Sequence, residues 1–246
     1  MEGVAPADWV LPPGVRAIQT LRTGGRSLPP FDGFNLADHC GDDPTSVAAN
    51  RARLRQILDL RTEPVWLQQV HGIAVAAAHD HLPGTCQADA SWTDRPGVVC
   101  AVLTADCLPV LIASDDGRVV AAAHAGWRGL CQGVLEATVT ALPVAPSTVS
   151  AWLGAAIGPQ AFEVGPEVRA AFLQAQPESA VAFRRVDADR WLADLYALAR
   201  LRLARAGVAR VVGGGQCTYR EAQRYYSFRR DTRCGRMAAL IWRDGT

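Results

Sequence analysis

Three short apolar runs between residues 98 and 123 constrain the fold of this chain more than any other feature of its sequence. They are Val98–Leu103, Val110–Ala113 and Val119–Ala123, and a turn signal, Asp115-Asp116-Gly117, separates the last two. Apolar runs of about four to eight residues bounded by turns are typical of strands that are buried on both faces. We therefore expect three buried strands, the last two joined by an Asp-Gly hairpin turn. No apolar run approaches the ~18 residues that a membrane-spanning helix needs.

The remainder of the chain alternates strand and helix patterns irregularly. Further strands are predicted at Val15–Leu21, Val65–Val70, Ile73–Ala78, Ala151–Leu153, Val208–Val212 and Met237–Trp242. Helices are predicted from the Asp43-Pro44 cap to Leu58 and at Gly129–Leu142, Pro166–Gln174 and Arg190–Ala206. The Gly- and Pro-rich segment Arg22–Asp43 is predicted to be a long loop. This order favours an α+β fold with mixed sheets and outer helices. Because no linker interrupts residues 1–246, we expect a single domain.

Composition excludes several classes of function. Hydrophobic residues make up 49% and charged residues 20% of the 246-residue chain, as in globular proteins. The formal net charge of +1 argues against strong electrostatic binding of nucleic acid or anionic membranes. All 25 basic residues are arginine. The absence of lysine excludes a lysine nucleophile, a Schiff base and a phosphate-loop lysine.

Cysteine usage and the N-terminal sequence bear on the compartment. The seven cysteines are scattered, and no Cys-x-x-Cys pair occurs. A chain of this size does not need disulfides, and the N-terminus lacks the basic and then apolar pattern of a signal peptide. We therefore expect a reduced, cytoplasmic protein.

Three residues that could bind a metal each follow or end a predicted strand. His71 precedes Gly72, Cys107 follows a buried strand, and His124 ends the run Val119–Ala123. Strand ends project side chains into shared crevices. Two imidazoles and a thiolate suit zinc and would leave a fourth position open. The same residues also permit a second interpretation, in which Cys107 is a nucleophile and a histidine is its base.

Two other segments could bind anions or bases. Ala125–Gly129 is a Gly-rich turn that leads into a helix. The segment Tyr225–Asp231 interleaves aromatic side chains with Arg229 and Arg230, a combination that can stack a base and hold an oxyanion. A solvated loop whose aromatic residues pack on the core would have the same sequence.

Taken together, the motifs resemble one family. The most specific are Thr104-Ala105-Asp106-Cys107-Leu108-Pro109-Val110 and His124-Ala125-Gly126-Trp127-Arg128-Gly129. Others are Phe34-Asn35-Leu36, Gly41-Asp42-Asp43-Pro44, Asn50-Arg51, Gln68-Gln69-Val70-His71-Gly72, Ala88-Asp89-Ala90, Gly154, Ile157-Gly158-Pro159, Phe162-Glu163-Val164-Gly165 and Tyr226-Ser227-Phe228-Arg229-Arg230-Asp231. In residues and order they resemble the YfiH family of bacterial laccase-domain, or polyphenol oxidase, proteins, which are described as zinc-dependent purine nucleoside phosphorylases. The resemblance extends from about Val15 to Trp242. Cys234 stands where the family usually has Thr, which puts in doubt any contact made there by a hydroxyl.

The resemblance implies a fold, a metal and several activities. The implied fold is a single-domain mixed β-sandwich flanked by helices, and His71, Cys107 and His124 would be the catalytic zinc ligands. The implied reactions are phosphorolysis of adenosine, guanosine, inosine and 5′-methylthioadenosine, and deamination of adenosine. Copper-dependent phenol oxidation and Cys-dependent editing of peptidoglycan precursors are the alternatives. Five histidines are too few for a multicopper cluster, although one His₂Cys centre resembles a mononuclear copper site.

Within this scheme, further residues become candidates for substrate binding. Arg51, Arg229 and Arg230 are candidates for binding phosphate or the negative charge that develops on the departing base. Asp89 and Gln68 would orient ligands or bind polar substrate edges, and Asn35 would bind a substrate hydroxyl. The expected partners are purine nucleosides and phosphate, with neither nucleic acid nor membrane.

Overall fold

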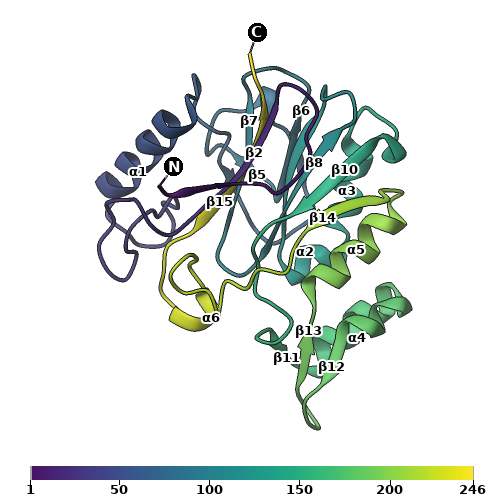
Figure 1. Cartoon of the computed structure of the whole chain (residues 1–246). Coiled ribbons are helices and arrows are strands. Elements are labelled where there is room, and N and C mark those ends of the chain that lie inside the picture. The colour runs from purple at the N-terminus through teal and green to yellow at the C-terminus, as the bar shows by residue number, and fades with distance from the viewer. Residues whose placement is uncertain (1, 246) are drawn as a thin grey trace.

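The apolar runs near the middle of the chain form the two central strands of one β-sheet and an edge strand of a second sheet that faces it. The computed structural model describes residues 2–245, and Figure 1 shows its layered arrangement. Strands β8 (Leu108–Ser114) and β9 (Val120–Ala125) are antiparallel neighbours in one sheet, and β7 (Val99–Thr104) belongs to the other. The Gly117 N–H donates to the Ser114 carbonyl at 2.9 Å, which closes the predicted Asp-Gly turn between β8 and β9.

The first sheet has four antiparallel strands in the order β1-β2-β15-β7. Besides β7 they are β1 (Val4–Pro6), β2 (Val15–Thr20) and β15 (Met237–Arg243). Pairing of Leu240 with both Ile18 and Ala101 fixes the register of β15 between its neighbours. The C-terminal strand therefore lies at the centre of this sheet.

The second sheet has six strands in the order β14-β10-β8-β9-β6-β4. Its other members are β4 (Val75–Ala77), β6 (Ala90–Thr93), β10 (Val149–Leu153) and β14 (Arg210–Gly213). The outer pairs β10–β14 and β4–β6 are parallel and the inner pairs are antiparallel. The sheet is therefore mixed, as the irregular order of elements predicts.

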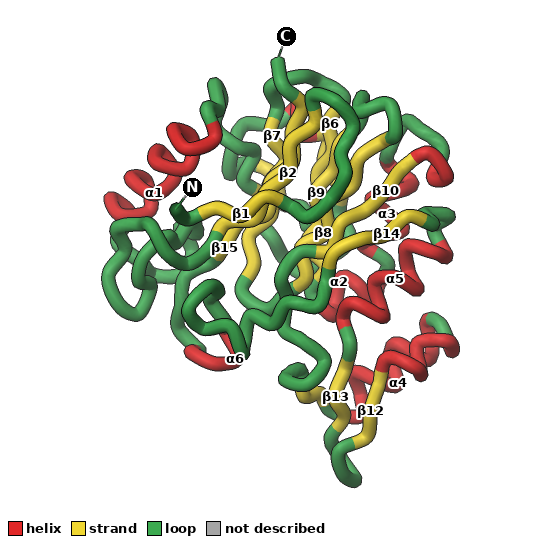
Figure 2. The backbone as a smooth tube through the Cα atoms, in the orientation of Figure 1, coloured by secondary structure: helices red, strands yellow, loops and turns green. Residues whose placement is uncertain are grey.

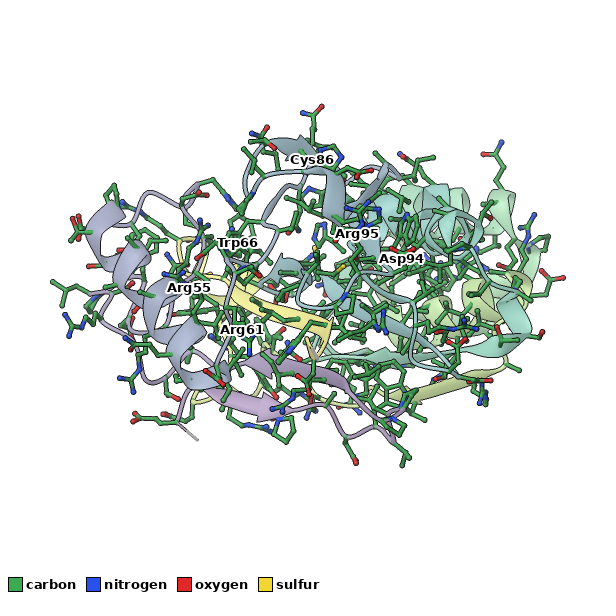
Figure 3. The ribbon with its side chains drawn as sticks, turned by 90° about the horizontal axis from the view of Figure 1, so that it is seen from above. Arg55, Arg61, Trp66, Cys86, Asp94 and Arg95 are labelled. Carbon is green, nitrogen blue, oxygen red and sulfur yellow. The ribbon has the colours of Figure 1, made fainter. Side chains whose placement is uncertain are left out.

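Alternation of side chains along the strands separates the core into layers. Leu111 of β8 and Val120 of β9 point toward the first sheet and pack there with Ile241 of β15. Their neighbours Val110 and Ala121 point the other way, toward the helices. Figure 3 looks down on these layers from above and shows the strands between helix α1 and the helices of the opposite side.

Helices cover the outer faces of both sheets. Helix α1 (Pro44–Leu58) packs Leu54 and Leu58 against the first sheet, and the Asp43 carboxylate caps it by accepting from the Ser46 N–H. Helices α2 (Trp127–Gln132), α3 (Val134–Ala141) and α5 (Leu195–Arg205) cover the second sheet. The remaining helices are α4 (Pro166–Ala175), α6 (Phe228–Asp231) and three 3₁₀ turns, Ala78–Asp80, Pro146–Thr148 and Pro177–Ala182.

Two predicted helices differ from the structure. The helix predicted at Gly129–Leu142 is two helices, because Gly133 adopts a left-handed conformation (φ 105°) that ends α2 and starts α3. The helix predicted from Arg190 begins only at Leu195. Strand β13 (Trp191–Ala193) precedes it, and the Asp194 side chain caps it.

Several short strands escaped prediction because long-range pairing defines them. Strand β13 lies between β11 (Glu163–Val164) and β12 (Phe183–Arg185), and with α4 these strands form the lower lobe in Figure 2. A two-stranded sheet pairs β3 (Leu67–Gln68) with β5 (Cys86–Gln87), so the strand predicted at Val65–Val70 shrinks to two residues.

The expected fold class is confirmed: a single-domain α+β fold in which a mixed β-sandwich is flanked by helices. In the part of the chain that the structure describes, no helix is both long and apolar enough to cross a membrane.

Candidate metal centre

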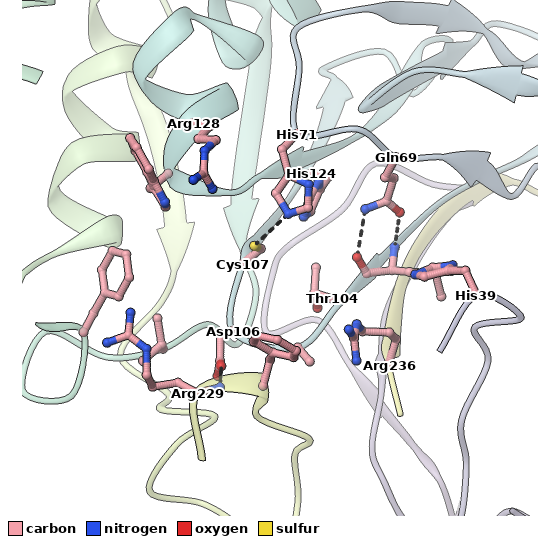
Figure 4. Close-up of a pocket in the computed structure, with 16 residues that line it drawn as sticks. His39, Gln69, His71, Thr104, Asp106, Cys107, His124, Arg128, Arg229 and Arg236 are labelled. Carbon is pink, nitrogen blue, oxygen red and sulfur yellow. Dashed lines mark hydrogen bonds between the residues drawn. The ribbon is translucent and has the colours of Figure 1, made fainter. Parts of the chain in front are cut away.

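His71, Cys107 and His124 converge at one end of the sandwich. His124 lies on β9, Cys107 follows the turn after β7, and His71 lies in the loop after β3. Their ligand atoms all lie within 4.8 Å of one another, and the Cys107 Sγ is 4.0 Å from the His71 Nε2 (Figure 4). His124 is buried, whereas His71 is exposed, so one side of the group is open to solvent.

Two residues at this group, His71 and Asp106, have left-handed backbone conformations. His71 has φ 61° and Asp106 has φ 91°, values that non-glycine residues rarely adopt. The carboxylate of Asp106 accepts from the Thr218 hydroxyl at 2.6 Å and from the Arg229 N–H at 2.7 Å. Asp106 is thus a turn residue that ties the Cys107 loop to the C-terminal segment. Left-handed residues of this kind cost about 1–3 kcal/mol each and cluster at functional sites.

Asp89 orients both histidines. Its carboxylate is fully buried and accepts from the His124 Nδ1 at 2.8 Å, from the His71 N–H at 2.9 Å and from the Gly72 N–H at 2.7 Å. Burial opposes ionisation of Asp89, but the bonds from His124 and Gly72 outweigh it and hold its pKa below the ordinary value. With Nδ1 engaged, His124 presents Nε2 as its free nitrogen, the arrangement typical of metal-binding histidines.

The charges of the group favour a thiolate. Burial alone would raise the pKa of Cys107, but the imidazoles of His124 and His71 reverse that effect and lower the pKa to about 6. The pKa of His124 rises to about 9 despite burial, because it faces the Cys107 thiolate and the Asp89 carboxylate. A thiolate and two imidazoles are the donors that zinc prefers.

Gly126 leaves space for this group. A Cβ at this position would lie 2.9 Å from the Cys107 Sγ and 3.1 Å from the His71 Cδ2. The backbone therefore approaches the three side chains more closely than any larger residue would allow, which explains glycine at the start of α2.

A cavity of about 480 Å³ opens beside the three side chains. Its charged lining comprises three arginines, Arg128, Arg229 and Arg236, and one acid, Asp106, whose two oxygens already accept hydrogen bonds. Trp127, Phe162 and Phe228 add aromatic surface. A cavity of this size, polarity and aromatic content suits a small ligand with an anionic part.

The two adjacent arginines that we identified from the sequence, Arg229 and Arg230, lie in different environments. Arg229 lines the cavity. Arg230 does not: its guanidinium donates to the carbonyls of Thr218 and Tyr225 and to the neighbouring carboxylate of Asp231. Arg230 therefore holds the C-terminal segment together.

Three further candidates also lie outside the cavity lining. The Arg51 Nε donates to the Leu36 carbonyl, and its guanidinium stacks on Trp66 at 4.8 Å. Asn35 is fully buried and bonds to the backbone of Ala37. Gln68 is exposed and donates to the Gly84 carbonyl. The three side chains therefore lie outside this cavity, and their roles in substrate binding stay predictions.

Other lining residues were missed. Gln69 lines the cavity instead of Gln68, and its amide donates to the Leu103 carbonyl and accepts from the Leu103 N–H. Thr104 and Arg128 stand in the two most specific motifs, which is the signal that could have found them. The Cys234 Sγ lies 3.6 Å from the Arg236 Nη1, so sulfur makes a contact at the position where the family usually has the hydroxyl of Thr.

Together, the fold and the site define a helix-flanked β-sandwich with a candidate three-ligand metal centre at its strand ends. The chain belongs to the family described as multi-copper polyphenol oxidoreductase laccase, whose profile matches residues 16–244. It is 52% identical over 235 residues to "Purine nucleoside phosphorylase YfiH" of Escherichia coli, with 96% of each chain covered. A purine nucleoside phosphorylase of Pseudomonas aeruginosa is also 52% identical, over 236 residues and 96% of each chain.

A solved structure agrees with this placement. A Neisseria meningitidis protein superposes with a TM-score of 0.95 at 48% sequence identity, and the match covers 99% of this chain and 100% of that one. The resemblance to the YfiH family found from the motifs is therefore confirmed.

Proposed function

We propose that this chain is a zinc-dependent purine nucleoside phosphorylase that acts on adenosine, guanosine, inosine and 5′-methylthioadenosine. We propose deamination of adenosine as a second activity and the cytoplasm as the compartment. The observation that carries the proposal is the open His71, Cys107 and His124 group beside an arginine-lined cavity. The names of the relatives support it.

The donor set fits zinc. His71, Cys107 and His124 would bind the ion, and Asp89 would keep both histidines in their binding orientation. When bound, zinc would act as a Lewis acid toward a substrate oxygen or water. The close approach of Gly126 and the low pKa of Cys107 are the features of this chain that prepare the group for a cation.

Phosphorolysis requires cations that this cavity offers. A phosphate oxygen forms a bond to the anomeric carbon of the sugar, the bond from that carbon to the purine nitrogen breaks, and the base leaves with the electron pair. Guanidinium groups would bind the phosphate or stabilise the charge on the base. Of the residues that we identified for this task, Arg229 lies in the lining. Deamination consumes water instead of phosphate, so the two reactions make different demands on one cavity.

Two alternatives have observations in their favour. The family description favours a copper-dependent phenol oxidase, although a His₂Cys group with five histidines in the whole chain offers too few imidazoles for a multicopper cluster. The low pKa of Cys107 favours a cysteine-dependent hydrolase, such as one that edits peptidoglycan precursors, with Cys107 free of metal.

One experiment separates these functions. Protein purified without added metal is analysed for zinc and copper, and base release is measured from inosine with phosphate and from adenosine without phosphate. About one zinc per chain together with phosphate-dependent base release would support the proposal. Copper with phenol oxidation, or full activity of metal-free protein, would favour the first or the second alternative.

A further inference from the structure

The cavity carries more positive charge than its own side chains neutralise. Among the described residues that line it, Arg128, Arg229 and Arg236 outnumber the Cys107 thiolate and the one carboxylate, Asp106, which accepts from the Thr218 hydroxyl and the Arg229 N–H. We propose that Arg128 and Arg229 together form the binding site for the phosphate co-substrate in this cavity. This inference rests on the proposed phosphorylase function and adds Arg128, the arginine of the motif that follows His124.

Arg128 is the first half of the site. Its guanidinium carbon lies 4.5 Å from the centre of the Trp127 ring, a stacking contact that orients the group and leaves its edges free. Across residues 2–245, the guanidinium makes no hydrogen bond to a protein acceptor and no ion pair with a carboxylate. Arg128 is exposed, so its donors contact water in the free protein and are accessible to a ligand.

Arg229 is the second half. Its guanidinium carbon lies 5.4 Å from the centre of the Phe162 ring, and one nitrogen, Nη1, donates to the Glu163 carbonyl at 2.8 Å. The bond from its own N–H to Asp106 fixes the start of α6, so the base of the side chain is also held. No carboxylate neutralises it within the described residues, and Nε and Nη2 stay free.

Both arginines line the cavity. In the view of Figure 4 they lie to one side of the Cys107 thiol, Arg128 above it and Arg229 below it, whereas Gln69, His39 and Arg236 lie to the other side. Two planar guanidinium groups that keep their charge at any physiological pH suit a tetrahedral dianion, which offers oxygens to both. Arg236 differs from this pair, since its Nη1 already donates to the carbonyls of Cys234 and Gly235.

The side of the cavity opposite Arg128 and Arg229 contains a buried hydroxyl that could bond to a polar group of a ligand. Thr104 lines the same cavity and is 1% exposed, and its hydroxyl has no hydrogen-bond partner among residues 2–245. A buried hydroxyl without a partner is costly, so a ligand that supplies one gains affinity. With phosphate on the Arg128 side, the nucleoside would occupy the Thr104 side, next to the three metal-binding side chains.

The test compares Arg128→Gln and Arg229→Gln with the parent protein. Arg118→Gln is the matched control, because it removes one arginine charge from the β8–β9 turn, where Arg118 pairs with Asp116. Binding of inorganic phosphate, without nucleoside, is measured by calorimetry or phosphorus NMR on the protein as purified. The KM for phosphate is measured with inosine. Loss of one charge-assisted contact predicts an increase of about ten- to a hundredfold in both constants for each variant and none for the control.

Two outcomes distinguish this inference from the proposed function. If the parent releases base from inosine and both variants keep its KM for phosphate, the phosphate site is elsewhere and the inference fails. If the parent binds phosphate and both variants lose that binding, but no nucleoside is cleaved, the site is supported and the phosphorylase function fails. Arg128→Lys and Arg229→Lys keep the charge but lose the planar fork, and we expect them to restore only part of the affinity.

Discussion

The cavity has two walls that are built differently. On one wall, His124 and Cys107 lie at the ends of sheet strands, and one buried carboxylate, Asp89, orients both histidines. The other wall contains Arg229, which belongs to a four-residue helix in the C-terminal segment. Hydrogen bonds to backbone carbonyls, many of them from Arg230, hold that segment in place.

The two walls differ in the roles of their side chains. On the sheet wall, the Asp89 carboxylate acts on both metal-binding histidines through hydrogen bonds. On the C-terminal wall, two adjacent residues of the same type separate into one that faces the cavity and one that supports the segment. The sheet wall is therefore suited to hold an ion, while Arg229 on the C-terminal wall, like Arg128 of α2, presents charge to the cavity. The predictions below test this division, starting with the largest effect.

His124→Ala should have the largest effect, because it removes a ligand from the sheet wall. We expect the loss of most bound metal and a fall in activity greater than the ~10- to 100-fold typical of residues that only support a ligand. The fold should persist, since separate apolar clusters hold the layers together. Metal analysis and base release measure the effect, with His79→Ala as a control outside the cavity. A metal-free His124→Ala protein with full activity would contradict the zinc mechanism.

Asp89→Asn should have the next largest effect. Asn keeps one acceptor oxygen but places an NH₂ group where backbone N–H groups of the His71 loop now donate. We expect metal affinity to fall by about 10- to 100-fold, as measured by competition with a chelator. Asp116→Asn is the control, because that carboxylate also accepts several hydrogen bonds, from Ser114 and Arg118, but lies at the β8–β9 turn. Equal losses of metal affinity in both variants would mean that Asp89 only supports the fold and does not orient the metal-binding histidines.

Gly126→Ala tests how tightly the sheet wall is packed. The new Cβ would lie 2.9 Å from the Cys107 Sγ, so the thiol must move away from its partners. We expect about tenfold weaker metal binding, within the range found when a ligand's orientation is disturbed. Gly72→Ala is the matched control, because its Cβ would meet the Asp89 Oδ2 at an ordinary 3.6 Å. Unchanged metal affinity in Gly126→Ala would show that the Cys107 side chain can shift away from the new Cβ without loss of metal binding.

Arg230→Ala should affect stability and spare phosphate binding. The side chain donates to the carbonyls of Thr218, Tyr219 and Tyr225, so its loss should lower the free energy of unfolding by about 1–3 kcal/mol. Denaturant unfolding measures this change. The KM for phosphate should stay at the parent value. A rise as large as that of Arg229→Gln would mean that both arginines reach the ligand, against the division described above.

Gln68→Ala should have the smallest effect. Its side chain is exposed and makes one hydrogen bond, to the Gly84 carbonyl, so unfolding should change by less than about 0.5 kcal/mol. The neighbouring change Gln69→Ala should cost about 1–3 kcal/mol, because its amide bonds in both directions to Leu103. Activity assays on both variants complete the comparison. Loss of activity in Gln68→Ala alone would restore Gln68 as a substrate-binding residue.

Much of this architecture follows from the sequence. The apolar runs that became β7, β8 and β9 are local patterns, because burial on both faces needs continuous apolar side chains. The start of α1 is equally local, since Asp43 and Pro44 act on the turn that they begin. Two imidazoles and a thiol at predicted strand ends are compatible with a metal site or with a cysteine nucleophile, and the family resemblance favours the metal site.

Only the tertiary structure decided which residues face the cavity. Gln68 and Gln69, or Arg229 and Arg230, are the same in type and differ by one position, and no local pattern tells them apart. The Gln69 amide donates to the carbonyl of Leu103 in β7. The Arg230 guanidinium donates to the carbonyls of residues 218, 219 and 225. Strands β3 and β13 likewise exist through their pairing with distant segments. Side-chain chemistry is a property of each residue, whereas its direction depends on contacts between segments that the sequence places far apart.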